Sequence, residues 1–132
     1  MSAEAGASAA TAAPTVHRVL DADLRFGDWG PGYLVQEEDA AFGTLVLRPG
    51  DAFANHLHEH HTESFLVLEG EVEVWLDRTH QVRLTRLELL QARPGVEHLV
   101  RNAGDASARL LFIKTPAVDG DKVDRPWTPS AA

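Results

Sequence analysis

From about residue 16 onward, glycines and prolines divide the chain into short segments of strand-forming residues. Residues 71–76, with the sequence GluValGluValTrpLeu, alternate strictly between polar and apolar side chains, which is typical of a strand with one buried face. No window longer than about ten residues shows helical periodicity. Short strands with frequent turns predict an all-β sandwich or barrel. The clearest apolar runs are residues 33–35, 44–47, 65–68, 72–76, 87–90 and 110–113.

The size and charge of the chain restrict both its organisation and its partners. With 132 residues it has enough length for a single domain with a hydrophobic core. A net charge of −8 argues against nucleic acids and anionic membranes as partners, because both are bound by basic surfaces. The sequence contains no cysteine, so a metal site must use nitrogen and oxygen donors.

The two ends of the chain differ in composition from the part between them. Residues 1–15 are rich in alanine and lack the basic start and Leu-rich core of a secretory signal. We therefore expect a disordered N-terminal tail over residues 1–15, a cytoplasmic protein, and one domain over residues 16–132. Residues 115–132 contain several prolines and should form a C-terminal tail, with Trp127 anchored over the barrel mouth or on a neighbouring subunit.

Residues 56–63, HisLeuHisGluHisHisThrGlu, hold four of the seven histidines of the chain. His56 and His58 are two positions apart, so on a strand both side chains point to the same face. Glu63 begins the next apolar run, and a tight connection would return its carboxylate to the same point. A fourth donor should come from elsewhere in the fold, and His98, which follows a Pro-Gly turn, is the natural candidate.

Three imidazoles and one carboxylate form a donor set that suits Fe(II), Mn(II), Ni(II), Co(II), Cu(II) or Zn(II), and the sequence does not rank these ions. Four protein ligands on an octahedral ion leave two adjacent positions for water, substrate or oxygen. Open positions are typical of catalytic metal sites. A single histidine is usually a surface or core residue, but chance explains two at this spacing with a nearby Glu much less easily.

The spacing of these donors resembles a known family. The pattern Gly50-x5-His56-x-His58-x4-Glu63-x6-Gly70 matches the first motif of the cupin family at every fixed position.

The second cupin motif is met in part. Gly95, His98 and Asn102 fit it, whereas Leu87 and Arg93 stand where a glycine and a proline are expected. The turn before the run at 87–90 could therefore be built differently. Asn102 is expected to cap the turn that follows it.

The resemblance covers residues 42–114 and implies a small single-domain cupin, an antiparallel jelly-roll barrel. It implies a divalent metal ion inside the barrel, bound through His56, His58, Glu63 and His98. It also implies a homodimer, because many such proteins exchange or pair N-terminal strands.

Four further residues are candidates for roles at such a site. His60 and His61 could act as acid or base, although a turn after His58 would leave both near the mouth in supporting or surface roles. Tyr33 could serve as a base or form part of the pocket wall. Arg48 could line an opening and bind a carboxylate or phosphate group of a substrate.

These patterns favour a metal-dependent enzyme that acts on a small polar substrate inside the barrel. Fe(II) would support a dioxygenase, whereas Mn(II), Ni(II) or Zn(II) would support an isomerase, an epimerase or a lyase. One alternative is a non-catalytic metal- and small-molecule-binding module, such as a sensor or accessory protein. Another is a storage or structural barrel with a vestigial site.

Overall fold

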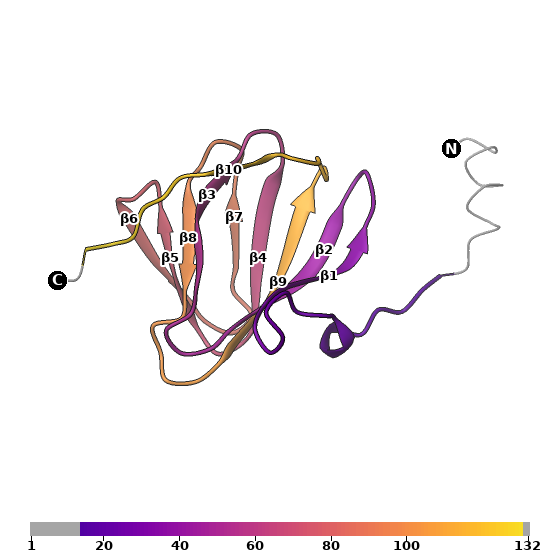
Figure 1. Cartoon of the computed structure of the whole chain (residues 1–132), viewed down its shortest axis with the longest axis horizontal. Helices are drawn as coiled ribbons and strands as arrows, with labels where there is room; N and C mark the ends of the chain where they lie inside the picture. Colours follow the sequence, from indigo (N-terminus) through magenta and orange to yellow (C-terminus); the bar gives the residue numbers. More distant parts are fainter. Residues whose placement is uncertain (1–13, 131–132) are drawn as a thin grey trace.

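The computed structural model describes residues 14–130, and within that range the chain forms ten strands and one short 3₁₀ turn, Val19–Asp21 (Figure 1). The N-terminal tail expected over residues 1–15 lies outside the described residues except for positions 14 and 15, which are exposed and belong to no strand. None of the described residues forms a helix long and apolar enough to cross a membrane.

The strands form two antiparallel sheets of five, which stand side by side as a curved wall in Figure 1. This arrangement confirms the predicted all-β jelly-roll barrel. The first sheet has the order β1 (Gly30–Gln36), β2 (Ala41–Leu47), β9 (Ala108–Thr115), β4 (Thr62–Glu69) and β7 (Leu89–Ala92). The second has the order β10 (Lys122–Asp124), β3 (Ala52–His58), β8 (His98–Arg101), β5 (Val72–Leu76) and β6 (His80–Leu84).

The inward-facing side chains change from polar to apolar along the barrel. On β4, buried Glu63 is followed on the same face by buried Phe65 and Val67. On β8, buried His98 is followed in the same way by buried Val100. Apolar side chains therefore fill one end of the barrel, and polar side chains gather at the other end.

Strand β3 contains one extra residue between Phe53 and His56. Phe53 pairs with Val100 of β8 and His56 pairs with His98, so three steps on β3 match two steps on β8. An odd spacing would normally place Phe53 and His56 on opposite faces of the sheet. The bulge brings both into the interior, where their ring centroids lie 5.1 Å apart.

The strand expected over residues 87–90 begins later than predicted. Strand β7 starts at Leu89, and Leu87 lies in the preceding turn with a φ of 69°. The N–H of Leu87 donates to the carbonyl oxygen of Val67, which holds the turn against β4. A positive φ is a conformation that favours glycine. The cupin motif has glycine at this position, and Leu87 adopts the same backbone conformation without being glycine.

After β9 the chain crosses to the second sheet, where β10 pairs with β3 at the sheet edge (Figure 1). An edge position suits a segment that is followed by prolines. Trp127 then packs against Trp75 of β5, with ring centroids 5.8 Å apart. The tail is thus anchored on the outer side of its own second sheet, and Trp127 is not among the residues that line the cavity beside His58 and His61.

Candidate metal centre

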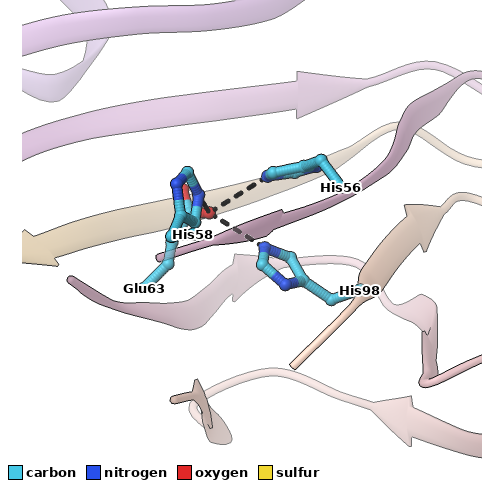
Figure 2. Close-up of side chains that lie close together, drawn as sticks. All are labelled: His56, His58, Glu63 and His98. Carbon is cyan, nitrogen blue, oxygen red and sulfur yellow. Dashed lines mark hydrogen bonds and ion pairs between the residues drawn. The ribbon is translucent and has the colours of Figure 1, made fainter. Parts of the chain in front are cut away.

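Four donor residues meet inside the polar end of the barrel. His56 and His58 lie on β3, Glu63 near the start of β4, and His98 at the start of β8. Strand alternation turns both β3 histidines inward, and the register of the sheet sets His98 directly opposite His56. All four residues are at most 2% exposed. The structure therefore brings together the whole donor set that the sequence predicts (Figure 2).

The three imidazole rings direct their Nε2 atoms at one oxygen, Oε1 of Glu63. The distances to that oxygen are 3.4 Å from His56, 2.8 Å from His58 and 3.0 Å from His98. Figure 2 shows the rings grouped around the carboxylate. Donors that bind one ion at about 2.1 Å and at right angles to each other lie about 3 Å apart. The observed separations match those of ligands that share an ion.

Backbone carbonyl groups fix the orientation of two of these rings. Nδ1 of His56 donates to the carbonyl oxygen of Ala54 over 2.7 Å, and Nδ1 of His98 donates to that of Val96 over 3.0 Å. A carbonyl oxygen can only accept, so in the neutral ring the proton is on Nδ1 and the Nε2 lone pair is free to bind a cation. Metal-binding histidines are held in this way by a partner on the second nitrogen.

The protonation states of these groups also suit a metal ion. Burial alone would raise the pKa of the Glu63 carboxyl, but its contacts with the three imidazoles outweigh burial and hold that pKa well below its ordinary value. Burial lowers the pKa of His56, which favours the neutral ring. Metal ligands must be ionised carboxylates and neutral imidazoles. The donor set therefore fits a divalent ion of borderline hardness.

His61 lies beside the donor cluster, with its ring centroid 3.9 Å from that of His58. Burial, together with a smaller effect of His58, lowers the pKa of His61 to about 4. Both ring nitrogens of His61 are buried and form no hydrogen bond within the described part of the chain, although Nδ1 lies 3.3 Å from the carboxylate of Asp121. Nε2 is therefore the nitrogen available to a bound ligand.

Asp121 holds the turn that carries His60 and His61. Its carboxylate accepts the backbone N–H groups of both residues, over 2.9 Å in each case, and Nδ1 of His60 over 2.6 Å. The side chain of His60 is 68% exposed. Of these two sequence candidates, the structure places His61 in the site and His60 at the surface.

A cavity of about 470 Å³ opens next to the donor cluster. Its lining includes His58, His61, Tyr33 and Lys114, and Asp121 from the segment before β10. Tyr33, the third sequence candidate, is therefore a wall residue of this cavity.

A second, smaller space of about 20 Å³ shares Tyr33 and Lys114 with the large cavity. Glu63 and three aromatic rings, those of Phe53, Phe65 and Phe112, belong to its wall. Tyr33 and Lys114 thus border both the open cavity and the small space beside the metal donors.

The structure does not bring Arg48 to the site. β2 ends at Leu47, and the guanidinium group of Arg48 pairs with Asp51 at 2.8 Å and with Asp28 at 3.5 Å. It also lies over the ring of Trp29, and it is not among the residues that line either cavity. Its local carboxylates explain its orientation without a substrate.

Sequence reasoning missed Lys114. On β9 the alternation that buries Leu110 and Phe112 also turns Lys114 inward, and its direct partner on β4 is Glu63. The sequence does contain a signal for this position. If the strand expected at 110–113 is extended by one residue, alternation places Lys114 on the same inward face as Phe112. A lysine at the end of a strand is normally solvated, which explains why the pattern alone did not select it.

Comparisons with known proteins agree with this geometry. A family model of the cupin domain matches residues 43–114. Polyketide synthase CurC of Streptomyces cyaneus is 33% identical over 75 residues, which cover 56% of this chain and 47% of that protein. Tetracenomycin polyketide synthase protein TcmJ of Streptomyces glaucescens is 31% identical over 74 residues, which cover 56% of this chain and 49% of that protein.

The chain spans about half the length of the curated relatives that it matches. A crystal structure of a conserved protein from Klebsiella pneumoniae with a double-stranded β-helix domain has a TM-score of 0.73 at 21% identity. That comparison covers 82% of this chain and 95% of the other, and it supports the fold.

Proposed function

The chain belongs to the cupin domain family, and from this membership and its inward-facing donors we propose a metal-dependent enzyme that acts on a small oxygenated substrate. One observation carries the proposal. The Nε2 atoms of three imidazole rings converge on a single carboxylate oxygen, and two of those rings have their other nitrogen held by a backbone carbonyl. A divalent cation is the group that four such atoms can bind in common.

The bound ion would supply Lewis-acid chemistry, by polarising a carbonyl, enol or carboxylate oxygen of the substrate. His56, His58, Glu63 and His98 would hold the ion. Because His58 also lines the large cavity, a substrate that occupies this cavity comes into contact with the metal-binding wall.

Two side chains on the cavity wall are proposed to act as general acid or base. Nδ1 of His61 faces the carboxylate of Asp121 at 3.3 Å, and the buried Nε2 has no hydrogen-bond partner among the described residues, so Nε2 can bond to a substrate and accept or donate its proton. Asp121 fixes the main chain at His61, which keeps the ring in one place. The hydroxyl group of Tyr33 lines the same cavity and is the second candidate.

The proposed substrate is an oxygen-rich, polyketide-type molecule. Two relatives carry polyketide synthase in their names, and molecules of this class have carbonyl and hydroxyl groups that can bind a divalent ion. The donor set admits a dioxygenase with Fe(II) and an isomerase or lyase with Mn(II), Ni(II) or Zn(II).

Elemental analysis of protein purified without added metal tests the proposal. We expect about one equivalent of a transition metal, and much less in His58→Ala. His80→Ala is the matched control, because His80 is exposed at the start of β6. Equal metal content in wild type and His58→Ala would contradict the ligand set.

Oxygen uptake and product analysis with aromatic and β-dicarbonyl test compounds would then separate the reaction classes. Uptake with bound iron would identify a dioxygenase. Turnover with zinc or manganese and no oxygen would identify an isomerase or lyase. Tight binding of these compounds without turnover would instead identify a non-catalytic binding module.

A further inference from the structure

Lys114 is a cation turned into the barrel beside the metal donors. It is the direct cross-strand partner of Glu63, and its Nζ atom donates to the hydroxyl oxygen of Tyr33 over 2.6 Å. The same atom lies 5.2 Å from the ring centroid of Tyr33 and 5.5 Å from that of Phe112. The ammonium group is therefore held against aromatic rings on the inner wall.

The charge of Lys114 is not matched by a carboxylate. The other lysine on the cavity wall, Lys122, pairs with Asp124 at 3.5 Å, whereas Lys114 forms no ion pair within residues 14–130. Lys114 is half-buried, and a cation that is partly removed from water is stabilised by a ligand of opposite charge. Because Lys114 lines the cavity of about 470 Å³, a ligand in that cavity can reach it.

The rim of the large cavity has the opposite sign. Glu37, Glu38 and Asp119 are exposed acidic residues of its lining. A ligand with several negative charges would be repelled at this rim, whereas a ligand with one charge could offset the repulsion through its contact with Lys114. The ring of Tyr33, which lines the same cavity beside Lys114, favours a flat, conjugated ligand.

We propose that Lys114, positioned by Tyr33, binds the negatively charged oxygen of a flat monoanion, an enolate or a phenolate. This inference rests on the proposed function, because it assigns a substrate class to the same cavity. It makes Lys114 the residue that selects the ionised form of the substrate, and it disfavours phosphates and dicarboxylates.

A matched pair of ligands tests the proposal. 1,3-Cyclohexanedione is an enolate at neutral pH, and its methyl enol ether has nearly the same shape without the charge. Binding of both to the full chain can be measured by calorimetry, in zinc-loaded and in chelator-treated protein. We expect wild-type protein to prefer the enolate by about tenfold or more, the range of a hydrogen bond to a charged group.

In chelator-treated protein Lys114→Met should bind the two compounds equally, and Lys114→Arg should keep part of the preference. Arg109→Met is the control, because it removes one positive charge from the other face of β9, where Arg109 donates to Thr44. Tyr33→Phe should reduce the preference by a smaller factor than Lys114→Met. If Lys114→Met does not fold, the arginine and phenylalanine variants carry the test.

The outcomes separate this inference from the proposed function. An enolate preference that persists unchanged in Lys114→Met, or that wild type lacks, overturns the role of Lys114. If the protein binds no metal but prefers the enolate in a way that depends on Lys114, the metal-dependent function is wrong and the anion site at Lys114 is supported. Malonate and inorganic phosphate should bind more weakly than the enolate, and tighter binding of either would contradict selection of a monoanion.

Discussion

His56 on β3 and His98 on β8 are direct cross-strand partners, and their ring centroids lie 4.3 Å apart. The distance between these two donors is set by a sheet register and does not depend on a loop. Donors held by regular structure are placed with little freedom before the ion binds, which favours tight binding. The remaining histidine donor, His58, lies on the same strand as His56, so two strands carry all three imidazoles.

Replacing Glu63 by Gln should lower both the stability of the metal-free protein and its affinity for metal. The amide keeps the shape of the side chain but removes the buried negative charge that the three imidazoles contact. Because these contacts hold the pKa of Glu63 well below its ordinary value, the carboxylate stabilises the metal-free fold at neutral pH, and we expect metal-free Glu63→Gln to unfold at a lower temperature than metal-free wild type. Added zinc should raise the unfolding temperature of wild type much more than that of the variant. A metal-free variant as stable as metal-free wild type, or a variant that zinc stabilises as much as it stabilises wild type, would contradict these expectations.

Leu87→Gly should stabilise the protein. Leu87 has a φ of 69° and is 63% exposed, so glycine relieves backbone strain and loses little packing. We expect a gain of about 0.5–1 kcal/mol in the free energy of unfolding, after the larger entropy loss of glycine is counted. Denaturant unfolding measures the difference. Leu89→Gly, in the adjoining strand, should destabilise instead; a loss of stability in both variants would show that the turn does not require glycine geometry.

Asp121 should contribute to stability in a defined range of pH. Burial opposes its ionisation, but the N–H groups of His61 and His60 outweigh burial and lower the pKa of Asp121 to about 2. The stabilising effect of the carboxylate is present above its ordinary pKa of about 4 and is lost as the pH falls from about 4 to about 2. Asp121→Asn should be less stable than wild type at neutral pH, and the difference should shrink over this range. Parallel stability curves in acid would argue against the contribution.

Because Gly43 has no side chain, it leaves room for the ring of Phe112 inside the barrel. A Cβ atom on Gly43 would lie 2.6 Å from the carbonyl oxygen of Gly32 and would overlap the Phe112 ring. Gly43→Ala should therefore lower the free energy of unfolding by about 1–3 kcal/mol, as expected for overpacking of a core. Gly104→Ala is the control, since the nearest atom to its Cβ would be 3.4 Å away. Thermal unfolding of the two variants compares them, and equal stability would mean that Phe112 adapts freely.

Sequence patterns predicted the parts of the molecule that depend on local periodicity. The spacing of His56 and His58 on a strand, and their closeness to Glu63, follow from the period of two and a short turn. Asn102 donates and accepts around the next turn as predicted, since its Oδ1 accepts the N–H of Gly104 over 3.0 Å. These features depend on residues within a few positions of each other.

Features that depend on long-range register escaped the sequence. Lys114 enters the site because β9 pairs with β4 and sets Lys114 opposite Glu63, which is far away along the chain, and the residues around Lys114 give no sign of this pairing. Arg48 was expected near an opening, but Asp51 and Asp28 hold it outside. Leu87 was expected in a strand, but its N–H donates to the carbonyl oxygen of Val67, and this hydrogen bond stabilises a turn despite the β propensity of leucine.

The extra residue in β3 makes this segment intolerant of insertions and deletions. Removing one residue between Phe53 and His56 would straighten the strand and rotate either the phenylalanine or both histidines toward the outside. The exposed side chain at position 54 can vary, whereas buried Asn55 donates to Glu97 and to the carbonyl oxygen of Arg125. The residue count from Gly50 to His58 should therefore stay fixed. A homologue that lacks one residue in this segment is expected not to bind the metal ion, however similar the rest of its sequence is.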